Sequence, residues 1–151
     1  MASSSPPIPV RVIHPHAEPP TGLPVIELPM SAIDRRRVRR LVEAPDGRVL
    51  ALELPTGTIL HPGQLLHHDA DAAYVVSAAD EDVLMVHPRD LAEAARVGHL
   101  IGNMHRDIHA SGTVVIALAD DVLVERLAKA GVRCERARRP FHGRAPGEHS
   151  H

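Results

Sequence analysis

The sequence predicts an α+β protein, with a small all-β domain in its first half and a βαββαβ domain in its second. Two observations lead to this prediction. Before residue 80, short apolar runs are separated by Gly and Pro, whereas after residue 80 apolar residues recur at helical spacing in two segments. The 151 residues suffice for two small domains, whose cores must consist of Leu, Val, Ile and Ala because aromatic residues make up 1% of the chain.

The beginning of the chain is rich in proline, with many of its 14 prolines before residue 24. Because proline fixes φ and has no backbone N–H, residues 1–24 are expected to form a flexible, extended arm. Residues 25–80 follow as a β-rich domain suited to binding a peptide or partner protein. The polar stretch 77–82 is expected to join this domain to the next.

A hairpin is the clearest local structure in the first half. The strand-like runs 37–43 and 48–54 flank Ala44-Pro45-Asp46-Gly47, and a Pro-Asp-Gly turn between two such runs favours a hairpin. The arginine-rich run from Arg35 to Arg40 leads into its first strand. That run reads either as a phosphate-binding patch or as the solvated face of a strand, and the second reading is favoured.

The second half changes to helical periodicity. Asp90 is placed near the positive end of the first helix dipole, and Gly131 is expected to end the second helix as its C′ residue. The βαββαβ order of the elements expected in residues 81–140 predicts a four-stranded antiparallel sheet with both helices on one face, which is the ferredoxin-like arrangement. The expected elements are strands 83–86, 106–109, 113–118 and 132–137, a helix running toward Asn103, and a helix beginning at Asp120.

Composition argues against several classes of function. A net charge of -2 gives no signature of nucleic-acid or membrane binding, and no apolar run approaches the roughly 20 residues that span a bilayer. RNA-recognition modules of this topology stack bases on aromatic residues, but this chain has only Tyr74 and Phe141. The single cysteine, Cys134, cannot form an intramolecular disulfide, and no signal peptide is recognisable, so a cytoplasmic protein is expected.

Histidine is the residue type that stands out, with twelve in the chain. Imidazole is a frequent ligand of divalent transition metals, so metal handling is the first function to consider. A structural zinc site needs four Cys or His ligands, which a chain with one cysteine and no CxxC motif does not fit. No HExxH motif is present, and most carboxylates lie at predicted helix caps and surfaces, which argues against a catalytic metal site.

The segment Gly102-Asn103-Met104-His105 closes the first predicted helix. With the helix before it, the strand 83–86 and the histidine-bearing C-terminus, it resembles the UreE family of urease accessory metallochaperones. The first half is similar to the N-terminal β domain of that family, in its Pro-Asp-Gly turn and in the strand boundary Leu54-Pro55-Thr56-Gly57. The similarity spans roughly residues 25–151.

The resemblance implies a non-enzymatic, homodimeric carrier that binds Ni²⁺ and passes it to the urease apoprotein and its accessory GTPase complex. His105 would be the principal ligand, with the two copies facing one ion across a two-fold axis. One imidazole holds a divalent ion poorly, and a symmetric interface doubles every ligand without enlarging the chain. Whether two dimers share one ion stays open, and imidazole also accepts Zn²⁺ and Cu²⁺.

Residues 141–151 are expected to form a flexible, histidine-bearing tail. By the same resemblance, His142, His149 and His151 would be auxiliary ligands that complete the metal shell at a small cost in loop entropy. A polar chain end without a metal role is the alternative reading of these three residues.

The chain departs from the family pattern at two places. Met104 stands where the family usually has arginine, and Ala119, Asp120 and Asp121 stand where additional histidines often precede the second helix. A carboxylate there can offer oxygen to a metal, but an Asp at a helix start is more often an N-cap, and capping is the expected role.

The sequence is also compatible with other functions and offers further histidines. A protein-interaction module that binds a client segment by strand addition, with incidental metal affinity, is one alternative, and a metal-dependent enzyme is another. His99 is read equally as a ligand or as a residue packed on the helix face. Neighbouring strand residues face opposite ways, so His67 and His68 are expected at the surface. No role is assigned to His14, His16, His61 and His87.

Overall fold

The structure, a computed structural model, describes residues 5–147. Within them lie ten β-strands in three sheets and two α-helices, which confirms the α+β class. The chain divides into two compact units after Ala78, close to the boundary expected at residue 80. Among the residues described, no helix is both long enough and apolar enough to cross a membrane.

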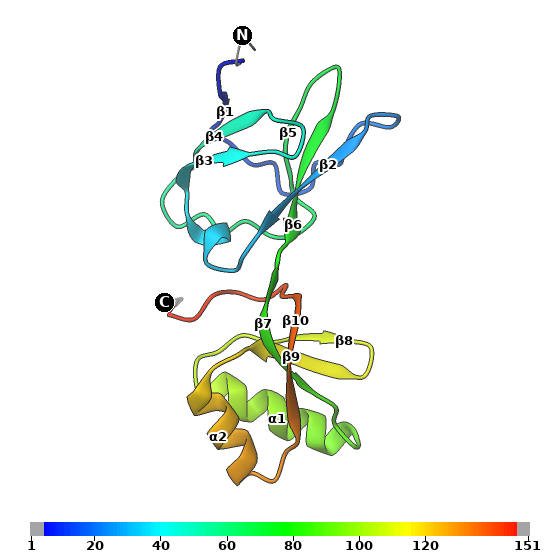
Figure 1. The fold of residues 1–151 in the computed structure, drawn as a ribbon, viewed down its shortest axis with the longest axis vertical. Helices are drawn as coiled ribbons and strands as arrows, with labels where there is room; N and C mark the ends of the chain where they lie inside the picture. Colours follow the sequence, from blue (N-terminus) through cyan, green and yellow to red (C-terminus); the bar gives the residue numbers. More distant parts are fainter. Residues whose placement is uncertain (1–4, 148–151) are drawn as a thin grey trace. The chain divides into compact units, whose positions relative to one another are not determined.

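Two three-stranded sheets make up the first unit (Figure 1). In the sheet of order β1-β4-β3, β1 runs parallel to β4, and β3 runs antiparallel to it. In the sheet of order β2-β6-β5, β2 runs parallel to β6, and β5 runs antiparallel to it. The strands are β1 (Ile8–Val10), β2 (Val25–Met30), β3 (Arg39–Glu43), β4 (Val49–Glu53), β5 (Leu65–His68) and β6 (Ala73–Ala78), and the short 3-10 helix η1 (Asp34–Arg36) precedes β3.

The hairpin predicted from the Pro-Asp-Gly turn is confirmed as β3 and β4. Gly47 occupies the left-handed region at φ 86, and its N–H donates to the carbonyl of Ala44 over 2.9 Å. Leu41 lies opposite Ala51 in the ladder and is 65% exposed. The other face of the hairpin, which includes Leu50, enters the core of the unit.

The expectation of a flexible arm over residues 1–24 does not hold for residues 8–10. These residues form β1, in which Ile8 pairs with Leu50, and Val10 is only 3% exposed. Proline is compatible with this strand because β1 lies at the edge of its sheet, and one side of an edge strand has no neighbouring strand to which a backbone N–H could donate.

The arginine-rich run is only partly a solvated face. Arg35 belongs to η1, is 2% exposed, and donates through its Nη1 to the carbonyl of Met30 over 2.7 Å. Burial lowers the pKa of Arg40 in β3, against the opposing effect of the Asp34 carboxylate nearby. A main-chain acceptor allows Arg35 to be buried, and no sequence spacing indicates such an acceptor.

The second unit has the predicted βαββαβ order and an antiparallel sheet of order β10-β7-β9-β8. Figure 1 shows both helices on one face of this sheet, as the ferredoxin-like arrangement requires. The elements are β7 (Asp80–Val86), α1 (Leu91–Asn103), β8 (His109–Ser111), β9 (Val114–Leu118), α2 (Asp121–Lys129) and β10 (Cys134–Pro140).

The core of the second unit lies between the helices and one face of the sheet. Alternate residues of the two central strands enter it, together with one side of each helix, as the periods of strand and helix require. The buried members are Leu84, Val86, Val97, Ile101, Val115, Ala117, Leu123 and Leu127.

Some strand boundaries differ from those expected. β7 begins at Asp80, so only Ala79 separates it from β6, and the polar stretch 77–82 is largely strand. The strand expected at 106–109 begins instead at His109, because residues before it complete the turn that ends α1. β10 extends to Pro140 because its residues pair along the whole of β7, from Val86 to Asp80.

Candidate metal centre

His105 lies immediately beyond the C-cap of α1. Its backbone N–H donates to the carbonyl of Gly102 over 2.9 Å, and the N–H of Arg106 donates to the carbonyl of Ile101 over 3.3 Å. These two bonds define a Schellman motif with Met104 as C-cap and His105 as the C′ residue. The motif satisfies carbonyls at the helix end and fixes the backbone from which the imidazole projects.

The C′ position requires a left-handed backbone, and His105 adopts it with φ 56. Among the residues described, it is the one non-glycine residue with positive φ. α2 ends in the same motif, where Gly131 at φ 74 donates to Ala128 and Val132 donates to Leu127. Glycine adopts this conformation at no steric cost, whereas a histidine there carries backbone strain, which often accompanies function.

The residues around His105 divide between solvent and core. His105 itself is exposed. Met104 is partly buried against the core of the second unit, so a side chain that departs from the family pattern has a packing role. His99 is exposed, and its Nε2 lies 3.1 Å from Nδ2 of Asn103, one helical turn later.

The carboxylates at the start of α2 act as the cap and surface residues that were expected. Asp120 is the N-cap of α2, and its Oδ1 accepts the N–H of Leu123 over 3.0 Å. Its other oxygen accepts from Nη2 of Arg106 over 2.7 Å, which links the start of α2 to the turn after His105. Asp121 is exposed and forms an ion pair with Arg136.

The sequence did not predict that a further histidine, His109, lies close to His142. His109 begins β8, and its Nδ1 accepts the backbone N–H of His142 over 3.2 Å, with the two rings 5.1 Å apart. This bond places the proton of neutral His109 on Nε2. Burial lowers the pKa of His109, the charge on His142 lowers it further, and the Asp107 carboxylate opposes both.

The described part of the expected tail is packed, contrary to expectation. Phe141 is 0% exposed and its ring lies 5.6 Å from that of His109, while the N–H of Arg144 donates to Asp107 over 2.7 Å. The residues of each pair are distant in sequence, so no local sequence pattern predicts these contacts. His149 and His151 lie outside the described residues.

Within residues 5–147, no group of three or more His, Cys, Asp and Glu side chains is arranged to hold a metal ion. Neither His105 nor His142 therefore belongs to such a group in the described part of a single chain. A histidine at a rigid helix end can supply one coordination position, and further ligands must then come from elsewhere.

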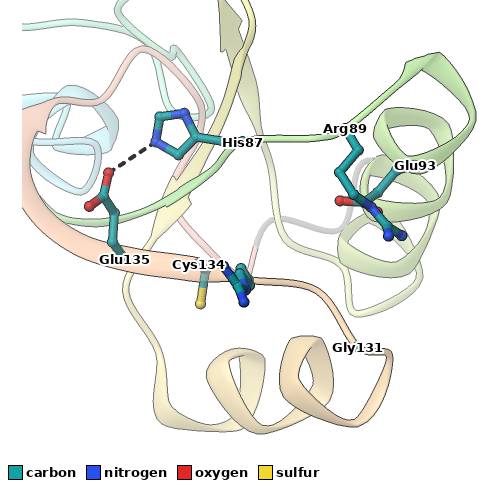
Figure 2. Close-up of a pocket in the computed structure, with 7 residues that line it drawn as sticks. His87, Arg89, Glu93, Gly131, Cys134 and Glu135 are labelled. Carbon is teal, nitrogen blue, oxygen red and sulfur yellow. Dashed lines mark hydrogen bonds and ion pairs between the residues drawn. The ribbon is translucent and has the colours of Figure 1, made fainter.

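A separate hollow of about 600 Å³ lies in the second unit (Figure 2). His87 and Glu135 face each other across 2.9 Å, and Arg89 forms an ion pair with the largely buried Glu93. Arg89 and Glu93 thus pair their charges, His87 and Glu135 lie within hydrogen-bonding distance, and no group of three possible metal ligands is found among these described residues either. The complete lining consists of His87, Arg89, Glu93, Gly131, Arg133, Cys134 and Glu135.

The two neighbouring histidines of the first unit lie in β5. His68 is exposed, whereas His67 is partly buried, with its ring stacked 6.1 Å from that of Tyr74 and its Nε2 4.0 Å from Asp69. The backbone N–H groups of residues 71 and 72 lower the pKa of Asp69. These contacts give His67 a packing role in the first unit.

Comparison with known proteins agrees with this architecture. The family model of the UreE urease accessory protein N-terminal domain matches residues 10–79, and that of the C-terminal domain matches residues 81–151. A urease accessory protein UreE from Synechococcus is 51% identical over 132 residues, which cover 87% of this chain and 89% of the relative. One from Deinococcus radiodurans is 48% identical over 126 residues, 83% of this chain and 81% of the relative. The chain therefore belongs to the UreE family of urease accessory proteins.

Proposed function

We propose that this protein is a non-enzymatic nickel metallochaperone that acts in urease maturation. It binds Ni²⁺ through His105 and delivers the ion to the urease apoprotein and its accessory GTPase complex. Membership of the UreE family supports the role in urease maturation, since the relatives are named urease accessory proteins. The observation that carries the metal role is the exposed imidazole of His105 on a backbone fixed by two hydrogen bonds.

The proposed carrier is a homodimer in which two copies of His105 share one ion. One exposed imidazole cannot supply a complete shell, and the described part of a single chain offers no group of three ligands. A two-fold axis through the ion doubles the ligand set, and a shell with few protein ligands leaves positions open for exchange. Exchange suits a protein that hands its metal on.

The tail histidines are proposed as auxiliary ligands. His142 lies at the root of the C-terminal segment, and His149 and His151 follow it in sequence. Zn²⁺ and Cu²⁺ are expected to compete for the same imidazoles, since nitrogen ligands bind Cu²⁺ more tightly than Ni²⁺.

Isothermal titration calorimetry with NiCl₂ tests the proposal on the full-length chain and on His105→Ala. The expected stoichiometry is one high-affinity ion per two chains, with that binding lost in the variant, and light scattering reports the dimer. His68→Ala is the control, because it removes an exposed imidazole of β5 that is expected to have no metal role. Unchanged affinity and stoichiometry in His105→Ala would exclude the carrier role and favour an interaction module with incidental metal affinity.

A further inference from the structure

We propose that Asp107 and His109 are positioning residues that anchor the C-terminal segment, residues 141–147, to the stretch of chain just after His105. The anchor sets the point from which the auxiliary histidines start. This inference rests on the proposed function, because it concerns how the tail reaches the same metal.

Two hydrogen bonds join the C-terminal segment to the stretch that follows His105. Oδ2 of Asp107 accepts the backbone N–H of Arg144 over 2.7 Å, and Nε of Arg144 lies 3.7 Å from the same oxygen. Oδ1 of Asp107 accepts the N–H of Ile108 over 3.0 Å, which orients the carboxylate. The second bond runs from the N–H of His142 to Nδ1 of His109 over 3.2 Å.

Packing adds to these bonds and explains a glycine. A Cβ atom built on Gly143 would lie 2.5 Å from Cζ of Phe141 and 3.1 Å from Oδ2 of Asp107. Phe141 is 0% exposed, so its ring has no solvent-facing space into which to move. Residue 143 can therefore lie against both Asp107 and the Phe141 ring only because it has no side chain.

The anchor lies on the face of the sheet that points away from the helices. His109 pairs with Ile116, and neighbours across a ladder share a face. The residues on either side of Ile116, Val115 and Ala117, belong to the core beneath the helices, so Ile116 and His109 face the other way. The segment thus packs on a surface that α1 and α2 leave uncovered.

The anchor shortens the length of unattached chain that precedes the tail histidines. Asp107 follows His105 by two residues, which span at most about 7 Å. His149 follows Arg144 by five residues, at most about 18 Å, but follows the end of β10 at Pro140 by nine. The effective concentration of a tail imidazole near the metal falls as roughly the 3/2 power of the length of unattached chain before it. Releasing the segment from Asp107 should therefore lower that concentration about two- to threefold for each tail.

Two substitutions test the anchor from opposite sides. Asp107→Ala removes both acceptor oxygens, and Gly143→Ala places a methyl group against the Phe141 ring and Oδ2 of Asp107, which should displace residue 143 from Asp107. Each should raise the Kd for Ni²⁺ by about two- to threefold, or by roughly sixfold if both tails of a dimer supply ligands. Asp71→Ala, an exposed carboxylate of the first unit, is the control and should leave the Kd unchanged.

Two further readouts separate positioning from general damage to the fold. Hydrogen exchange at the Arg144 amide in the metal-free protein should accelerate by roughly tenfold or more in Asp107→Ala, while the amides of β9 keep their protection. In a chain truncated after Gly147, Asp107→Ala should no longer alter the Kd. Equal effects of Asp107→Ala in full-length and truncated chains, or unchanged exchange at Arg144, would overturn the anchor. Loss of the His105 dependence would instead overturn the proposed function.

Discussion

The backbone N–H of His105 donates to the carbonyl oxygen of Gly102, and the histidine takes up a left-handed conformation at φ 56. At the end of α2, Gly131 makes the equivalent bond to Ala128 at φ 74. The chain thus builds the same helix ending once with glycine and once with histidine. The left-handed conformation costs an ordinary residue about 1–2 kcal/mol, so the fold carries strain at the residue proposed to bind the metal.

His105→Gly should make the metal-free protein more stable than His105→Ala by about 0.5–1 kcal/mol. Both variants lose the imidazole, so the difference isolates the backbone. Relief of about 1–2 kcal/mol of strain is partly offset by about 0.5–1 kcal/mol of glycine entropy in the unfolded chain. Urea denaturation monitored by circular dichroism gives the two free energies of unfolding.

The matched control is Gly131→Ala, which creates the same strain at the end of α2 and should lower stability by about 1 kcal/mol. If His105→Gly were the less stable of the two His105 variants, backbone strain at His105 would be disproved.

Asp120→Ala should lower the free energy of unfolding by about 1–2 kcal/mol without changing nickel affinity. The carboxylate caps α2 and accepts from Arg106, and loss of an N-cap alone costs about 1 kcal/mol. Asp120→Asn keeps a capping oxygen and should retain most of the stability. Thermal denaturation and calorimetry with Ni²⁺ on the same samples provide the measurements. Weaker nickel binding by Asp120→Asn would show that the Asp120 carboxylate is a metal ligand.

Local sequence signals predicted the parts of the fold that neighbouring residues determine. Pro45-Asp46-Gly47 gave the hairpin turn, Asp120 the cap of α2, and Gly131 its end, because each acts on a backbone a few residues away. The order of the elements then limited the second unit to one familiar arrangement, which the sheet order confirms.

Contacts between distant residues were not predictable in the same way. β1 joins its sheet by pairing with residues 50–52, Arg35 is buried against a main-chain carbonyl, and Phe141 packs against His109. No spacing within one segment indicates such partners. The family resemblance singled out His105, but the strained backbone beneath it was not expected, because the C′ position normally takes glycine.

Met104→Arg should lower stability by about 1 kcal/mol and leave the nickel stoichiometry unchanged. Met104 packs partly buried against the core of the second unit, and a guanidinium there must keep its charge in water while only its stem covers the core. Met104→Leu is the control and should cost less than that, since this exchange nearly conserves volume. Urea denaturation compares the three chains. Equal stability of Met104→Arg and the parent would mean that the packing of Met104 contributes nothing measurable.

Alkaline pH should weaken the first unit through Tyr74. This residue is 1% exposed and donates to Oδ2 of Asp46 over 2.7 Å. Burial, followed by the hydrogen bond to Asp46, raises the pKa of Tyr74 to about 12. The folded state therefore favours the neutral phenol, which contributes stability below the unfolded pKa of about 10, and this contribution is lost as the pH rises toward 12.

The loss should approach 2–3 kcal/mol, roughly the value of two pKa units. Because Tyr74 is the chain's single tyrosine, tyrosinate absorbance reports it directly. The midpoint should lie near 12 in the folded protein and near 10 in concentrated urea. In Tyr74→Phe, the decline in stability assigned to this group between pH 10 and 12 should disappear. A folded-state midpoint near 10 would mean that neither burial nor the Asp46 carboxylate acts on the phenol, so Asp46 would not hold the hairpin turn against β6.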